Sequence, residues 1–283
     1  MNKLKLDLTN SSLNAESVKQ TNQSAVKRFE QSASTYKQKA RLQKDTGRLL
    51  LKLIDEALVK SQDSKPFPLL MPDFGLDLGC GPGLFTNELA KRCHYLTSSD
   101  LSMAMLHSND NKAGKVCADS HSLPFRTSSI DWCYSSLMVQ WCDFESVVRE
   151  ALRVVKPGGV VAIATLLPGS LFELESAWKE VDSGQHIHQY QTEFELKQAL
   201  SSLDFNKLST SKKDFVYWYK DAMALAKELK SLGANFVKQR SNKGLVSLNK
   251  WRDMESNYKR LFFNLEKQAL PATYCVQTIV ITK

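Results

Sequence analysis

Hydrophobic and polar positions alternate along the chain in blocks that predict a repeat of strands and helices. Short apolar runs predict strands over 74–78, 94–99, 115–117, 130–135 and 160–166. Apolar residues at helical spacing predict helices over 84–91, 101–109 and 144–155, the last ending before Pro157-Gly158-Gly159. This order predicts an α/β fold with a mostly parallel sheet and helices on both faces.

The same patterns continue on both sides of this central region. Apolar residues from Phe29 to Leu53 predict one or two helices before the first strand. Later patterns predict helices over 171–181, 192–203, 221–232 and 248–263, and two further strands over 215–219 and 274–282. The expected total is a seven-stranded sheet.

The predicted elements lie in one domain. We expect residues 1–25 to be a mobile polar tail and 26–283 to be a single unit. Within it we distinguish N-terminal helices (26–64), a ligand-binding core (73–167) and a substrate-side part with helices and the final strands (168–283). Lys65–Pro72, with three prolines, is the expected connector.

Composition predicts a cytoplasmic protein. The chain of 283 residues is long enough for one substantial core, and it has no apolar run long enough to cross a membrane. Its six cysteines lack the C-x-x-C spacing of a zinc site, and we expect small, mostly buried thiols.

The net charge is concentrated in one part of the chain. Residues 204–283 contain 15 Lys or Arg against 7 Asp or Glu, which accounts for the whole net charge of +8. A basic C-terminal part suggests an acidic partner: nucleic acid, a phosphorylated small molecule or an acidic carrier protein. A solvated, lysine-rich surface is an equally good interpretation of charge alone.

The stretch LDLGCGPGLFT, residues 76–86, is the strongest candidate for a binding site. Three glycines in five positions are costly unless φ is positive or a ligand approaches the main chain closely. A loop between a strand and a helix would present backbone N–H groups where open α/β sheets bind nucleotides. The spacing G-x-G-x-G differs from the dinucleotide fingerprint, because Leu84 occupies the place of its third glycine.

Two acids follow the next two predicted strands, Asp100 and then Asp119 within ADSHSLPF. With the glycine loop and the later LRVVKPGG, they resemble the class I S-adenosylmethionine-dependent methyltransferases over about Asp73 to Leu167. The resemblance implies a Rossmann-like methyltransferase fold and S-adenosyl-L-methionine as cofactor. It implies cofactor-binding roles for Asp77, Gly79, Cys80, Gly81, Gly83, Asp100, Leu101, Asp119, Ser120 and Ser135.

A narrower resemblance extends beyond this core. Segments around Tyr36, Val139-Gln140-Trp141-Cys142, Leu166 to Leu171 and Leu229 to Asn235 are together similar to the malonyl-[acyl-carrier-protein] O-methyltransferase family of biotin synthesis. It implies methyl transfer to the free carboxylate of a malonyl thioester on acyl carrier protein, leaving S-adenosyl-L-homocysteine and a methyl ester that primes pimeloyl synthesis. Tyr36, Gln140 and Trp141 would shape the acceptor pocket, and Arg240 would pair with the acceptor carboxylate.

Several alternatives stay open. The chain could methylate another small carboxylate or a quinone-type ring, or it could be a non-catalytic cofactor-binding subunit. A nucleic-acid methyltransferase would need an Asn/Asp-Pro-Pro-aromatic element, which the sequence lacks. His186-x-His188 has metal-pair spacing, but we expect a loop without metal, and Cys80 is interpreted as a filler rather than a nucleophile. The sequence leaves open whether carrier protein or coenzyme A holds the acceptor, and it leaves the oligomeric state open with a monomer favoured.

Overall fold

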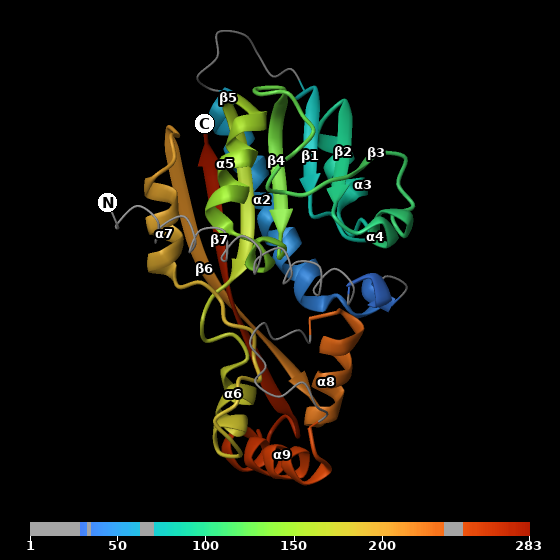
Figure 1. Ribbon diagram of the computed structural model, residues 1–283, viewed down its shortest axis with the longest axis vertical. Helices are drawn as coiled ribbons and strands as arrows, with labels where there is room; N and C mark the ends of the chain where they lie inside the picture. The colour runs from blue at the N-terminus through green and yellow to red at the C-terminus, as the bar shows by residue number, and fades with distance from the viewer. Residues whose placement is uncertain (1–28, 33–34, 63–70, 235–245) are drawn as a thin grey trace, which may run out of the picture.

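The strands of this computed structural model pair into one seven-stranded sheet, described within residues 29–32, 35–62, 71–234 and 246–283 (Figure 1). Their order is β3-β2-β1-β4-β5-β7-β6. The strands are β1 Phe74–Leu78, β2 Tyr95–Asp100, β3 Gly114–Cys117, β4 Ile130–Ser136, β5 Val155–Leu166, β6 Lys207–Tyr219 and β7 Leu270–Thr282. β1 to β5 pair in parallel, and β7 runs antiparallel to both β5 and β6. This confirms the mostly parallel, Rossmann-like sheet.

Helices cover both faces of the sheet, as predicted. Their bounds are α2 Arg41–Gln62, α3 Thr86–Leu89, α4 Met103–His107, α5 Phe144–Val154, α6 Phe172–Lys179, α7 Glu193–Ser201, α8 Ala222–Ser231 and α9 Leu248–Phe262, with 3-10 turns at η1 Ala90–Arg92 and η2 Val139–Trp141. α5 and α7 pack on one face, in a core that includes Leu76, Cys133 and Ile163. α2 packs on the other, in a core that includes Trp132 and Tyr134. Residues 29–32 and 35–39 are also helical and precede α2.

The parity of β4 decides which side chains reach which face. Side chains alternate along a strand, so Trp132, Tyr134 and Ser136 point to the α2 face. Cys133 and Ser135 point to the α5 face. The predicted site residue Ser135 therefore lies on the α5 face of the sheet, and its neighbour Ser136 lies on the α2 face.

β6 and β7 extend well past the rest of the sheet. β5 pairs with β7 only from Val160↔Thr282 to Leu166↔Val276, whereas β6 pairs with β7 on to Tyr219↔Leu270. The overhanging ends carry α6, α8 and α9 as a separate lower lobe (Figure 1). Buried Glu173 of α6 accepts the backbone N–H of Thr273 at 3.1 Å and thereby fixes the lobe to β7.

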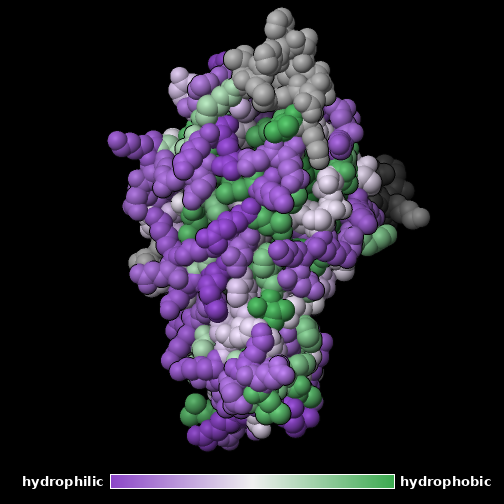
Figure 2. Space-filling model, turned by 180° about the vertical axis from the view of Figure 1, so that it is seen from behind, coloured by the Kyte–Doolittle hydropathy of each residue, from purple (hydrophilic) through white to green (hydrophobic). Residues whose placement is uncertain are grey.

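Hydrophobic side chains reach the surface on both parts of the molecule. Seen from behind, hydrophilic side chains dominate, and hydrophobic patches lie between them on the broad upper part and on the narrower lower part (Figure 2). The lobe's exposed hydrophobic residues include Phe172, Met223, Leu248, Leu261 and Leu265. No helix among the described residues is long and apolar enough to cross a membrane.

Some element bounds were predicted wrongly. β6 begins at Lys207 rather than 215, because eight exposed, mostly polar residues form an edge strand. β5 begins at Val155, since the chain continues through Pro157-Gly158-Gly159 as irregular strand, with Gly158 N–H bonded to the carbonyl of Lys283. α3 and α4 are shorter than predicted. The expected tail (1–25) and most of the connector (65–72) lie outside the described residues.

Candidate functional site

The glycine loop uses its own N–H groups within the fold. Gly79 and Cys80 both donate to the carbonyl of Ser99, at 2.8 and 3.0 Å, and Gly83 donates to the carbonyl of Cys80. Gly81 N–H donates to Asp100 Oδ2 at 2.8 Å. The expectation that the loop presents N–H groups to a ligand is therefore wrong at these positions, and α3, with four residues, offers no helix N-terminal site. A loop with its donors already engaged is unsuited to a pyrophosphate.

Beside the loop lies an open cavity of about 820 Å³, the glycine-loop cavity. It occupies the carboxyl ends of β1, β2 and β4. Its lining includes the predicted residues Gly79, Gly81, Asp100, Leu101, Asp119, Ser120, Tyr36 and Trp141. Gly81 has φ +53°, and a Cβ added there would meet no atom within 4 Å, so its backbone faces open space. A ligand bound in this cavity would contact the backbone of Gly81 directly.

Asp100 is the central acid of this cavity. Its Oδ2 accepts from Gly81 N–H and its Oδ1 accepts from Ser102 N–H, both at 2.8 Å. Burial raises the pKa of this carboxyl, and the backbone N–H groups oppose the shift. Each oxygen keeps a second lone pair, so Asp100 can still accept two hydroxyls of a ligand.

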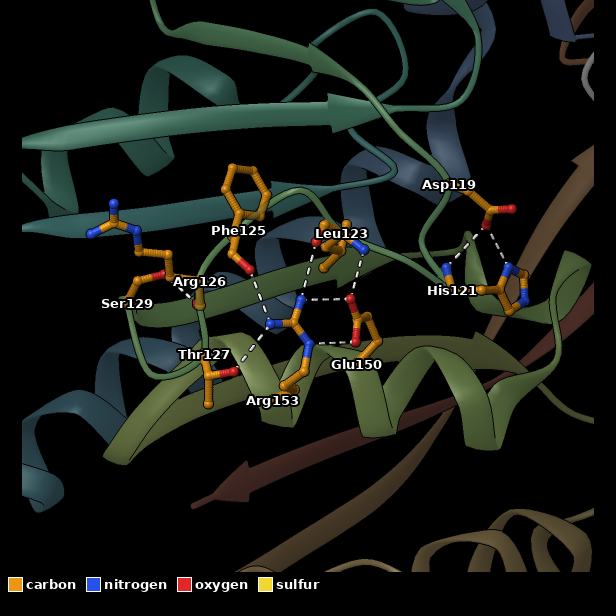
Figure 3. Close-up of polar contacts among 9 residues, drawn as sticks. All are labelled: Asp119, His121, Leu123, Phe125, Arg126, Thr127, Ser129, Glu150 and Arg153. Atoms are coloured by element: carbon orange, nitrogen blue, oxygen red, sulfur yellow. Dashed lines mark hydrogen bonds and ion pairs between the residues drawn. The ribbon is translucent and has the colours of Figure 1, made fainter.

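Asp119 lies at the opposite rim and is half-exposed. Its Oδ1 accepts from the backbone N–H of His121 at 3.0 Å and contacts His121 Nδ1 at 2.5 Å (Figure 3). His121 Nε2 in turn accepts from the N–H of Asp143, the N-cap of α5, at 3.2 Å. The rim is thus bonded to the start of α5.

Arg153 of the LRVVKPGG segment anchors the rest of that rim. It donates to the carbonyls of Leu123 and Phe125, each at 3.0 Å, and pairs with Glu150 at 2.7 Å (Figure 3). Glu150 also accepts from the N–H of Leu123 at 2.6 Å. Arg153 and Glu150 therefore hold Leu123 and Phe125 in place, which gives the LRVVKPGG segment a positioning role rather than a ligand contact.

Asp77 lines a smaller, adjoining cavity of about 390 Å³, the Asp77 cavity. Thr86 Oγ1 donates to its Oδ2 at 3.1 Å, and Asn109 Nδ2 donates to Thr86. Burial, helped by the nearby Asp100, raises the pKa of Asp77 to about 7, although the Thr86 bond opposes the shift. A cationic group bound here would favour the ionised carboxylate. Cys80 lines the same cavity, and burial raises the pKa of its thiol strongly, which opposes a role as nucleophile.

A third cavity of about 560 Å³, the Tyr274 chamber, meets the glycine-loop cavity at a shared wall. Both cavities are lined by Phe29, Tyr36, Leu137 and Trp141. Phe29 meets Trp141 edge to face at 5.6 Å. The remaining lining of the chamber is mostly apolar, with Gln43, Gln140 and Glu228 as its polar members.

The charge of Glu228 is matched by its neighbours. Arg41 pairs with Glu228 at 2.8 Å, and Tyr219 donates its hydroxyl to the same carboxylate at 2.7 Å. Arg41 also lies over the rings of Tyr217 and Tyr219. This network joins α2, β6 and α8 behind the chamber.

Not every predicted site residue lines a cavity. Gly83 has φ +78° and packs against Asn109, where an added Cβ would come within 2.3 Å of its side chain. Ser135 is buried toward α5 and lines neither cavity at the glycine loop. Arg240 and Asn235 lie outside the described residues. Gln140 lines the Tyr274 chamber and donates to the carbonyl of Leu137 at 2.8 Å.

The histidine pair does not form a metal site. His186 stacks on Trp178 at 3.9 Å and contacts Asp182 at 2.7 Å, whereas His188 contacts the carbonyl of Gln140 at 3.1 Å. Among the described residues no cluster of His, Cys, Asp and Glu is suited to a metal ion. All six cysteines are free, but Cys117 is exposed and only three are buried, so the expectation of mostly buried thiols was only partly right.

Sequence reasoning did not assign several lining residues to the site, among them Ser136, Phe29 and Gln43. Ser136 lines both cavities at the glycine loop in place of Ser135, and strand parity could have identified it. Phe29 and Gln43 come from the helical residues before the sheet, and only tertiary packing brings them here. The buried Oε1 of Gln43 has no hydrogen-bond partner within the described residues. A polar ligand would satisfy such an atom.

Comparisons with known proteins agree with this geometry. A model described as "Methyltransferase domain" matches residues 76–163. The chain is 31% identical to a malonyl-[acyl-carrier protein] O-methyltransferase of Erwinia pyrifoliae, over 84% of this chain and 86% of that protein. It is 32% identical to the biotin biosynthesis bifunctional protein BioHC of Cellvibrio japonicus over 90% of this chain, but spans about half of that relative (49%). The fold is similar to the YcgJ protein of Bacillus subtilis, with TM-score 0.55, 15% identity and coverage of 83% of this chain and 98% of that one.

Proposed function

This chain belongs to the malonyl-[acyl-carrier protein] O-methyltransferase family, and we propose that it esterifies the free carboxylate of a malonyl thioester. The methyl donor is S-adenosyl-L-methionine, and the acceptor is held on an acyl carrier protein. The product is the malonyl methyl ester that primes pimeloyl synthesis for biotin.

One observation carries the proposal: two cavities share a wall. The glycine-loop cavity has the carboxylates of Asp100 and Asp119 along its rim, whereas the Tyr274 chamber is lined by aliphatic and aromatic side chains together with Gln43, Gln140 and Glu228. Phe29, Tyr36, Leu137 and Trp141 belong to both. A methyl donor in the first cavity and an acyl chain in the second would meet there.

The residues of the glycine-loop cavity fit an adenosyl cofactor. In this proposal Asp100 accepts from the ribose hydroxyls, while Asp119 and Ser120 lie against the adenine. Gly79, Gly81 and Leu101 contact the ribose and methionine portions, and Asp77 with Cys80 faces the methionine end. The hydroxyl of Ser136 also lines this cavity. The N–H groups of Gly79, Cys80, Gly81 and Gly83 are bonded within the fold, which suits a cofactor that carries no phosphate.

The chemistry demands positioning more than proton transfer. When bound, the cofactor supplies a methyl group on a positively charged sulfur. A malonyl carboxylate is already ionised at neutral pH and needs no general base to act as nucleophile. The chain must align donor and acceptor and exclude water, and the aromatic wall performs both tasks.

Tyr36 has a specific role in this arrangement. Burial and the charge of Asp100 raise the pKa of its phenol, so it remains a neutral donor throughout the physiological range. It lines both cavities and the Asp77 cavity. We assign it to orienting the acceptor carboxylate, with Gln140 and Trp141 shaping the chamber around the thioester.

The test is methyl transfer from labelled S-adenosyl-L-methionine to malonyl-carrier protein, malonyl-coenzyme A and free malonate in parallel. Label in an alkali-labile ester on the carrier supports the proposal. Ester on coenzyme A alone would show that the acceptor is malonyl-coenzyme A and not the carrier protein. No ester on any malonyl acceptor, with cofactor binding intact, would refute the proposed function.

A further inference from the structure

A fourth cavity continues the Tyr274 chamber toward the outside of the lobe. This α8 cavity, of about 1010 Å³ with its mouth, shares Leu171, Tyr190, Leu229 and Ala234 with the chamber. It also reaches Trp178 and Trp251, which meet edge to face at 6.3 Å, and the exposed Lys230. The glycine-loop cavity, the Tyr274 chamber and the α8 cavity thus form one series from β1 to the outer surface of α8.

We propose that the α8 cavity is the channel through which the phosphopantetheine arm of the carrier protein reaches the acceptor chamber. This inference rests on the proposed function. The arm is a long, thin chain with a thioester at one end, apolar and amide groups along its length, and a phosphate at the other. The series of cavities offers the matching order, with apolar and aromatic walls inside and a lysine at the mouth.

A competing entrance exists between α6 and α7. This α7 cavity, of about 920 Å³, shares only Tyr190 with the Tyr274 chamber. Its lining includes Glu175, Glu195 and Lys179, and Lys179 is paired with Glu175 at 3.0 Å, whereas the described lining of the α8 cavity includes Lys230 and no carboxylate. The charged lining is thus net negative in the α7 cavity and net positive in the α8 cavity, which favours a phosphate at the second.

Charge on α8 also fits an acidic carrier. Lys227 and Lys230 are exposed on this helix, and within the described part of the chain neither forms an ion pair. The exposed hydrophobic residue Met223 lies on the same helix, one turn before Lys227. A positive surface with apolar neighbours complements an acidic protein and would mainly raise its rate of association.

Matched tryptophan substitutions separate the two entrances. Ala226 lines only the α8 cavity and Gln189 lines only the α7 cavity, and both positions are at least partly exposed, so a large side chain fits without disrupting the core. We expect Ala226→Trp to lower kcat/KM for malonyl-carrier protein about 20-fold or more, and Gln189→Trp to change it less than about twofold. Binding of S-adenosyl-L-homocysteine, unchanged in both variants, verifies the fold. An effect of Gln189→Trp alone, or of neither substitution, would overturn the proposal.

A trapping experiment tests the route without any turnover. The thiol of holo-carrier protein, activated as a mixed disulfide, is offered to Ala226→Cys and Gln189→Cys, with the unmodified chain as background. Faster disulfide formation at position 226 supports the channel, while equal or faster formation at 189 contradicts it. If the unmodified chain makes no ester on the carrier, the proposed function fails, and the trapping pattern still decides the route separately.

Discussion

The core around the glycine loop and the lobe of α6, α8 and α9 differ in how their cavities are built. In the core, backbone N–H groups and carboxylates are bonded to one another, as in the contacts of Gly79, Cys80 and Gly81. Around the α8 cavity and the Tyr274 chamber, aliphatic and aromatic side chains are mixed with polar ones such as His188, Gln140 and Glu228. In our proposal the core holds the cofactor by a fixed network of hydrogen bonds, whereas the cavities beyond it receive the malonyl thioester and its arm mainly by their shape.

Removal of the Asp100 carboxylate should have the largest effect of all, a loss of cofactor binding in the core. Asp100→Ala loses the acceptor of two proposed ribose hydrogen bonds and frees the N–H groups of Gly81 and Ser102. Two charge-assisted hydrogen bonds correspond to a loss of about 100-fold or more in cofactor affinity. Isothermal titration with S-adenosyl-L-homocysteine measures it. Asp110→Ala, at an exposed acid paired with Lys37, is the matched control and should bind normally.

Two glycines with the same backbone strain can show whether the cofactor contacts the glycine loop. Gly81 (φ +53°) and Gly158 (φ +75°) both adopt a left-handed backbone, and at both an added Cβ meets nothing within 4 Å. Alanine at either position should cost about 1–2 kcal/mol of stability. Only Gly81→Ala, inside the glycine-loop cavity, should weaken cofactor binding, by about tenfold or more. Equal affinities in the two variants would show that the cofactor does not approach the loop.

A substitution of the wall residue Tyr36 should impair use of the acceptor while leaving cofactor binding nearly unchanged. Tyr36→Phe removes one hydroxyl donor, and a single hydrogen bond corresponds to about a tenfold loss in kcat/KM for the malonyl acceptor. Cofactor affinity should change less than about threefold. Tyr95→Phe, at an exposed tyrosine far from the wall, serves as the control. A tenfold loss of cofactor affinity with unchanged acceptor kinetics would assign Tyr36 to the core instead.

The smallest expected effect is a pH dependence from Asp77. Its folded pKa of about 7 exceeds the ordinary value of 3.8, so the folded state holds the proton more tightly than the unfolded chain. The stability it contributes is present below pH 4 and is lost as pH rises through 7. Relative to the wild type, Asp77→Asn should gain about 3 °C or more in Tm between pH 5 and pH 8.5. A constant difference in Tm across this range would contradict the raised pKa.

The sequence predicted the core better than the lobe, for physical reasons. β1 was placed to the residue, because a buried parallel strand is a compact apolar run, and the more polar β2 was placed within one residue. β6 was mostly missed, since its first eight residues are exposed at the sheet edge and their polarity hides the strand. The irregular start of β5 was missed because Pro157-Gly158-Gly159 normally ends regular structure.

Site residues followed the same division. Asp100, Gly81 and Asp119 could be found because strand ends and glycine spacing carry local signals. Phe29 could not, because its place depends on how the N-terminal helices pack over the sheet. The cavities of the lobe arise from long-range packing among α6, α8 and β7, which no local pattern encodes.

A crystal structure of the chain with S-adenosyl-L-homocysteine would test the central claim, that donor and acceptor meet at the wall of Phe29, Tyr36, Leu137 and Trp141. The account predicts ribose hydroxyls at Asp100 and a sulfur atom facing the Tyr274 chamber across that wall. A ligand whose sulfur points away from the chamber, or one bound outside the glycine-loop cavity, would contradict it.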